Sequence, residues 1–126
     1  VAKLLEGDDD IQAIIGLLPS GVPAGVAALK DANKLGEVKL FGFGQHTKSL
    51  VALRDGHCDA LIIEDPVALA QKLTRTFKDF INLQRSKLPD DGYATVPART
   101  ITGENFDQFV SDWRESLSAA NSAQAD

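Results

Sequence analysis

The feature that most constrains the fold of this chain is a repeated alternation of short apolar runs with helical patterns. The predicted strands cover residues 11–16, 38–43 and 60–64, and the predicted helices follow them at residues 24–33, 47–55 and 66 to about 86. Alternation of strand and helix is typical of an α/β fold with a parallel sheet. Because the strands are continuous apolar runs, we expect helices on both faces. The sequence therefore predicts an open parallel sheet with flanking helices.

The second half of the chain has a different pattern. Asp65 precedes Pro66, which suits a helix N-cap followed by proline in the first turn. Residues 93–100 are predicted to be extended, and a last helix is expected around residues 106–113. Residues 116–126 consist mostly of Ala, Ser, Asn and Gln, and we expect them to be disordered.

Length and composition exclude several classes of protein. A chain of 126 residues is enough for one domain, and its net charge of −5, without a basic cluster, argues against nucleic-acid binding. No apolar run approaches the ~20 residues that span a bilayer, so we expect no membrane insertion. The single cysteine, Cys58, excludes an internal disulfide.

Ligands of open parallel sheets bind outside the carboxyl ends of the strands. This rule selects three loops, at residues 18–22, 44–48 and 64–67. Their polar side chains make them candidates for a ligand-binding site, and the predicted ligand-binding residues are Ser20, Gln45, His46, Glu64 and Asp65. Asp65 has a second interpretation as a simple helix cap, so Glu64 is the better ligand candidate of that pair.

The stretch GFGQHT at residues 42–47 allows a nucleotide-binding interpretation. It follows a strand, precedes a helix and is one residue short of the dinucleotide fingerprint, with acidic residues about 20 positions later. Thr47 replaces the third glycine, however, and Gly42 and Gly44 can simply allow tight passage of the backbone at a strand end. We favour the interpretation in which the glycines only allow tight passage of the backbone, and no cofactor is predicted.

Neither catalysis nor a metal site is predicted. His57 and Cys58 are adjacent in the sequence, so they cannot form a paired metal site by themselves. They also precede the third strand, which places them at the edge of the sheet opposite to the ligand loops. The sequence therefore predicts a protein that is not an enzyme.

Several segments resemble the type I periplasmic binding proteins, the ribose-binding-like solute receptors of ABC transporters. DIQAII at residues 10–15 is similar to their "aspartate, apolar, x, Ala-Ile-apolar" strand. VKLFGF at residues 38–43, followed by RDG at residues 54–56, resembles their V-K-V-V-G-F-D … K-D-G segment at the same spacing. ALIIEDP at residues 60–66 resembles A-T-I-A-Q-D-P, and ITGENF at residues 101–106 resembles V-T-K-E-N-V. In their order and spacing, these segments extend the resemblance over most of residues 8–113.

The ligand positions of the family are not the same here. The family's Asn-Asp pair after the first of these strands is replaced by Leu18-Pro19-Ser20, its Asp after Gly-Phe by Gly44, and its Gln after the last strand by Glu64. Carboxylates and amides suit sugars because each can bind hydroxyls through two contacts. The resemblance therefore implies a polar small-molecule ligand, sugar-like or related, held by a different set of side chains.

The resemblance also implies a division of the chain. Residues 1–65 would belong to the C-terminal lobe of a two-lobed receptor, residues 66–95 would cross to the other lobe, and residues 96–115 would cross the hinge and form the last helix. Val1, Leu4 and Leu5 have helical spacing, so we expect the chain to begin inside a helix of a longer protein. The expected partners are a missing N-terminal lobe or second chain, or a homo-oligomer.

The functional expectation is a periplasmic or extracellular solute receptor, with an ABC transporter permease as a further partner. Ligand would be captured between two lobes by closure of a hinge. The alternatives are the effector-binding domain of a regulator of the lactose-repressor type and a nucleotide-binding α/β enzyme that uses residues 42–47.

Overall fold

The computed structural model describes residues 5, 7, 10–83 and 90–122. The chain forms two compact units. The first contains the residues up to Ile63 together with Thr100–Val110, and the second contains Glu64–Arg99 and the residues from Ser111 onward. The expected helix at the start of the chain lies largely outside the described residues.

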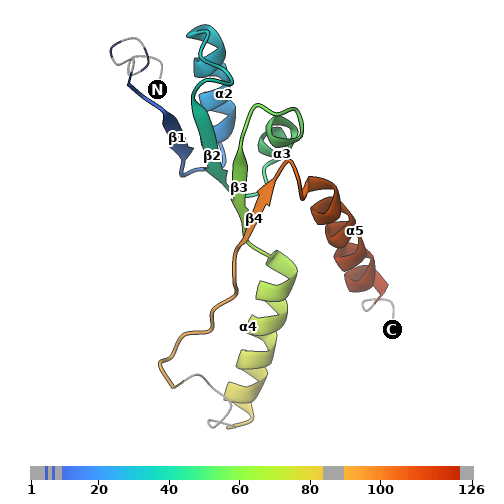
Figure 1. Ribbon diagram of the computed structural model, residues 1–126. Coiled ribbons are helices and arrows are strands. Elements are labelled where there is room, and N and C mark those ends of the chain that lie inside the picture. The colour runs from blue at the N-terminus through green and yellow to red at the C-terminus, as the bar shows by residue number, and fades with distance from the viewer. Residues whose placement is uncertain (1–4, 6, 8–9, 84–89, 123–126) are drawn as a thin grey trace. The chain divides into compact units, whose positions relative to one another are not determined.

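The first unit is built on a four-stranded sheet (Figure 1). Its strands are β1 (Ala13–Gly16), β2 (Lys39–Phe43), β3 (Ala60–Ile63) and β4 (Arg99–Thr102), and they follow one another in that order across the sheet. β1 and β2 are parallel, with Ile14 opposite Leu40, and β2 and β3 are parallel, with Gly42 opposite Leu61. Figure 1 draws β4 running in the opposite direction. The prediction of an α/β fold with an open parallel sheet is confirmed, and β4 adds one strand of opposite direction at an edge.

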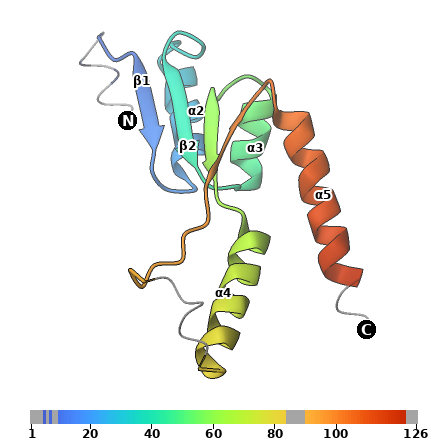
Figure 2. The same ribbon diagram turned by 60° about the horizontal axis from the view of Figure 1, so that its bottom comes forward.

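Two helices cover one face of this sheet. α2 (Gly21–Asp31) connects β1 to β2, and α3 (Thr47–Arg54) connects β2 to β3. Because crossovers between parallel strands are right-handed and both steps advance in the same direction, both helices lie on the same face (Figure 2). The core between helices and sheet contains large, fully buried side chains, namely Val22, Leu29, Leu40, Leu53 and Leu61.

The other face of the sheet is apolar but exposed. Ile15 on β1, Phe43 on β2 and Ile62 on β3 alternate with the buried positions, and Ile15 is 60% exposed. The continuous apolar strands led us to expect cover on both faces. Within the described part of the chain, these three side chains remain in solvent.

The second unit contains a long amphipathic helix, α4 (Pro66–Ile81). Asp65 is its N-cap and Pro66 lies in its first turn, as predicted. None of its residues is buried, and its apolar side chains, including Leu73, Phe77 and Phe80, are exposed. The predicted continuation to about residue 86 falls partly outside the described residues. None of the helices in the described ranges has the length and apolar character needed to cross a membrane.

Some element boundaries differ from the prediction. α2 begins at Gly21 instead of residue 24, because Pro23 fits the first turn of a helix, where its missing N–H has no intrahelical partner. α5 runs over Phe106–Ser122, so residues 116–122 are helical and not disordered. Alanine is the strongest helix former, and Ala119 and Ala120 favour this continuation. Residues 123–126 lie outside the described residues.

Candidate functional site

The first candidate loop connects β1 to α2 and presents Ser20. Ser20 occupies the N-cap position of α2, but its side chain makes no capping hydrogen bond. The turn is held by the backbone instead, since Gly21 N–H donates to the carbonyl oxygen of Leu18 over 2.8 Å. The Ser20 hydroxyl is exposed and is therefore available to a ligand.

The second candidate loop connects β2 to α3 and presents Gln45 and His46. Gly44 has a φ of +85°, a left-handed conformation that favours glycine, and its N–H donates to Ile62 O over 2.9 Å. His46 is the N-cap of α3, where its Nδ1 accepts a hydrogen bond from Lys48 N–H over 3.2 Å. A neutral imidazole that accepts at Nδ1 carries its proton on Nε2. His46 can therefore donate a hydrogen bond to a ligand from Nε2.

A buried serine joins these two loops. Ser49 in α3 is fully buried, and its hydroxyl donates a hydrogen bond to Pro19 O over 3.4 Å. A Cβ added at Gly44 would also lie 4.0 Å from Pro19 Cγ. The structure thus brings the loop after β1 against the loop and helix after β2, so that Ser20, Gln45 and His46 share one edge of the sheet. Sequence analysis did not identify Ser49, because a serine within a helical pattern resembles a surface residue.

The third candidate loop follows β3 and belongs to the second unit. Asp65 Oδ1 accepts hydrogen bonds from Val67 N–H at 3.0 Å and from Ala68 N–H at 2.9 Å. The cap interpretation of Asp65 is therefore correct. Glu64 is exposed and directly follows Ile63, the last residue of β3. The ligand role of both residues stays a prediction.

Gly42 has a packing role in the core. It lies inside β2, and a Cβ added there would overlap Val22 Cγ2 and lie 3.2 Å from Leu61 Cδ2. The absence of a side chain at Gly42 allows α2 to pack closely on the sheet. Close packing is therefore sufficient to explain why residue 42, the first of the GFGQHT stretch, is a glycine. A phosphate ligand is not needed to explain it.

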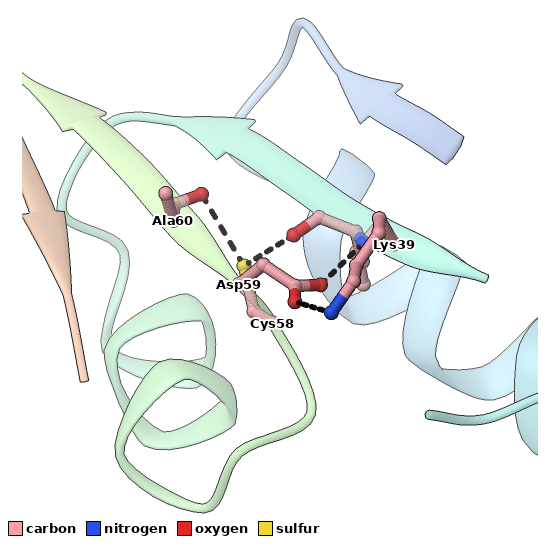
Figure 3. Close-up of polar contacts among 5 residues, drawn as sticks. Lys39, Cys58, Asp59 and Ala60 are labelled. Atoms are coloured by element: carbon pink, nitrogen blue, oxygen red, sulfur yellow. Dashed lines mark hydrogen bonds and ion pairs between the residues drawn. The ribbon is translucent and has the colours of Figure 1, made fainter. Parts of the chain in front are cut away.

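The opposite edge of the sheet contains a polar network around Asp59 (Figure 3). Asp59 Oδ1 lies 2.8 Å from Lys39 Nζ, and Asp59 Oδ2 accepts from Leu40 N–H over 2.8 Å. Partial burial acts to raise the pKa of Asp59, but the hydrogen bonds from Lys39 and Leu40 and the charge of Lys39 outweigh it, so the pKa of Asp59 is lowered. This network joins the start of β2 to the start of β3.

Cys58 lies in the same network and is a poor nucleophile. Its thiol is buried and lies 3.3 Å from Leu40 O and 3.5 Å from Ala60 O (Figure 3). Burial, with a smaller contribution from the charge of Asp59, raises the pKa of Cys58 to about 11. Because the thiolate is the reactive form, the thiol is inert at neutral pH. Within the described residues, no group of three or more His, Cys, Asp or Glu side chains is arranged to hold a metal ion.

Comparison with known proteins gives matches only among solved structures. No protein-family model matches the chain, and no curated protein matches it. A periplasmic solute-binding protein of an ABC transporter from Actinobacillus succinogenes, with bound D-allose, has a TM-score of 0.74 at 17% identity over 85% of this chain. GanP, a glucose-galactose binding protein from Geobacillus stearothermophilus, has a TM-score of 0.71 at 13% identity over 82% of this chain.

A third structure is an ABC transporter solute-binding protein from Bacillus halodurans with bound myo-inositol, which has a TM-score of 0.65 at 18% identity. The chain covers only 35% or 36% of each of these proteins, so it spans about a third of their length. The resemblance to periplasmic sugar receptors is confirmed at the level of the fold. The chain has the fold of one part of such a two-lobed receptor.

Proposed function

We propose that this chain is part of a solute-binding receptor that captures a small polar ligand, sugar-like or related, at the carboxyl ends of β1, β2 and β3. The observation that carries the proposal is the hydrogen bond from Ser49 to Pro19, which joins the loops of Ser20, Gln45 and His46 at one edge. In parallel sheets this edge is where ligands bind. The fold shared with sugar-binding proteins supports the same edge.

The chemistry of these side chains suits a hydroxylated ligand. The Ser20 hydroxyl and the Gln45 amide can each donate and accept hydrogen bonds, and the Nε2–H of His46 can donate one. Glu64 would accept hydrogen bonds from ligand hydroxyls, and Asp65 would do so through Oδ2, since Oδ1 is engaged by the helix cap. Ligand binding would proceed without any chemical change to the ligand.

The remaining part of the binding cleft would come from outside this chain. The proposed sources are a preceding N-terminal lobe, a second chain or another copy. The exposed apolar face at Ile15, Phe43 and Ile62 supports a further covering segment. In this proposal residues 1–65 form part of the C-terminal lobe, residues 66–95 cross to the other lobe and residues 96–115 cross the hinge. The receptor would act in the periplasm or outside the cell and deliver its ligand to an ABC transporter permease.

Calorimetric titration of the complete receptor, this chain together with the part that completes the cleft, tests the proposal. The panel contains D-allose, myo-inositol, glucose, galactose and a nucleoside, with NAD and ATP as tests of the nucleotide alternative. We expect one hydroxylated ligand to bind and Gln45→Ala to weaken it at least tenfold. Lys30→Ala, which changes an exposed residue in the last turn of α2, is the control and should leave binding unchanged. Binding of NAD or ATP alone, or of nothing in the panel, would contradict the proposal.

A further inference from the structure

His46 holds the start of α3 through both its side chain and its backbone. Its Nδ1 accepts the capping hydrogen bond from Lys48 N–H over 3.2 Å. Its carbonyl oxygen accepts from Ser49 N–H at 2.8 Å and from Leu50 N–H at 3.0 Å, which are the first hydrogen bonds of the helix. The conformation of the loop at residues 44–48 therefore depends on His46.

The cap exists only while the imidazole of His46 is neutral. A backbone N–H can only donate, so Nδ1 must offer a lone pair to Lys48 N–H. Protonation places a hydrogen on both ring nitrogens and leaves the imidazolium without an acceptor. The ring must then turn away from the helix end. Because the Lys48 N–H is exposed, water can replace Nδ1 as its acceptor, and the helix end opens without loss of the fold.

The charges around His46 favour release of the cap once the ring is protonated. The N-terminus of a helix carries partial positive charge, and the first turn of α3 contains Lys48 but no acidic residue. The first turn of α2 also has no acidic residue. Residues 17–22 and 42–45, which form the adjoining loop and strand end, contain no ionisable side chain. An imidazolium at the cap is therefore repelled from its own helix.

The charged groups of the other elements do not change this picture within the first unit. α2 packs against α3, but its charged residues Lys30 and Asp31 lie at its C-terminal end. Arg99, at the start of β4, is engaged in an ion pair. After β3, in the second unit, Asp65 caps α4 and Glu64 is exposed. Glu64 is therefore the carboxylate whose influence needs a control.

We propose that His46 is a pH-sensitive switch in the ligand site: the neutral imidazole caps α3 and holds the loop at residues 44–48, and protonation releases the cap and lowers the affinity for ligand. Histidine is the side chain whose charge changes between about pH 5 and pH 8. The effect on affinity rests on the proposed function, whereas release of the cap does not. A receptor with this switch binds its ligand at neutral pH and releases it in acid.

Amide NMR spectra of the complete receptor that contains this chain, without ligand and between pH 8 and pH 5, test release of the cap. The Lys48 amide should shift in step with the His46 ring, and its protection from hydrogen exchange should fall at least threefold. In His46→Asn the amide oxygen can cap the helix without titrating, so the Lys48 amide should not shift. His57→Asn, which removes the other histidine, is the matched control and should leave the Lys48 titration unchanged. A Lys48 amide that does not titrate in wild type, or titrates equally in His46→Asn, would overturn the proposal.

Calorimetric titrations of the same receptor with D-allose and with myo-inositol, at pH 7.5 and pH 5.5, test the effect on affinity. We expect Kd to rise at least threefold at pH 5.5 in wild type and in Glu64→Gln, and to change little in His46→Asn. An equal rise in wild type and His46→Asn, or its loss in Glu64→Gln, would overturn the switch. If neither compound binds while the Lys48 amide titrates as expected, the release of the cap is supported and its role in ligand binding is overturned together with the proposed function.

Discussion

Ser49 and Pro19 are 30 positions apart in the sequence, yet the buried hydroxyl of Ser49 donates a hydrogen bond to the carbonyl oxygen of Pro19. This bond connects the helix after β2 to the loop after β1. It explains why the candidate ligand residues of two separate loops occupy one edge of the sheet. The candidate site therefore depends on a residue that does not itself reach the ligand.

Replacing Ser49 should loosen this connection. Ser49→Ala leaves Pro19 O without its donor, and we expect a loss of about 1 kcal/mol in the free energy of unfolding. Urea denaturation measures the change. Ser20→Ala is the matched control, because the Ser20 hydroxyl is exposed and makes no cap bond. It should change stability by less than about 0.5 kcal/mol, and an equal loss in both variants would contradict the role given to Ser49.

The packing role of Gly42 predicts a steric effect. Gly42→Ala would place a methyl group against Val22 and Leu61, and we expect a loss of about 1–3 kcal/mol in unfolding free energy. Gly103→Ala should be nearly neutral, because nothing lies within 4 Å of a Cβ at that position. Adding Val22→Ala to Gly42→Ala should recover part of the loss. If Gly42→Ala leaves the free energy of unfolding unchanged, the close contact between α2 and the sheet does not require a glycine at this position.

The buried thiol of Cys58 predicts loss of stability at alkaline pH. Folding raises its pKa from 9.0 to about 11. Between these values the unfolded chain releases the proton and the folded chain retains it, so stability falls as pH rises. The buried thiol's contribution to stability is complete below about pH 8, and about 2 kcal/mol of it is lost by pH 11.

Comparing wild type with Cys58→Ala isolates this effect from other alkaline titrations. Denaturation curves at several pH values should converge for the two proteins as pH rises. At neutral pH, a thiol reagent should modify native Cys58 far more slowly than unfolded Cys58. Rapid modification of the folded protein would contradict the burial of the thiol.

The Asp59 network predicts loss of stability in acid. Folding lowers the pKa of Asp59. Its ionised carboxylate therefore contributes to the free energy of unfolding above the unfolded pKa of ~3.9, and this contribution is lost as pH falls through the lower folded pKa. Asp59→Asn should remove this acid dependence and cost about 1 kcal/mol at neutral pH. Asp55→Asn, which alters an exposed ion pair with Arg54, is the control and should change stability little. Equal acid dependence in wild type and Asp59→Asn would contradict the account.

Periodicity in the sequence was enough to predict the three parallel strands and their crossovers. The cap at Asp65 was also predictable, because a carboxylate before proline is a local signal. Gly42 was correctly assigned to a strand. The need for a glycine there comes from Val22, which packs against it from a helix that is distant in sequence. Ser49 could not be recognised as buried, because its partner Pro19 lies in another loop. Such long-range contacts have no local signature.

Burial was less predictable than secondary structure. The apolar runs of the strands favoured cover on both faces, yet Ile15, Phe43 and Ile62 are exposed. An apolar pattern indicates that a surface is suited to burial, but whether a covering element lies in the same chain is a separate matter. The same is true of α4, whose helix was predicted while the exposure of its apolar side was not.

The central claim is that a polar ligand binds at the carboxyl ends of β1, β2 and β3. The most direct test is a titration of the complete, isotope-labelled receptor that contains this chain with D-allose and with myo-inositol, followed by amide chemical shifts in NMR spectra, which detect weak binding residue by residue. The account predicts shift changes with at least one of them, concentrated at residues 18–22, 44–48 and 64–67, and little change around Lys39 and Asp59 at the opposite edge. Shift changes confined to that opposite edge, or none with either ligand at millimolar concentration, would contradict the claim.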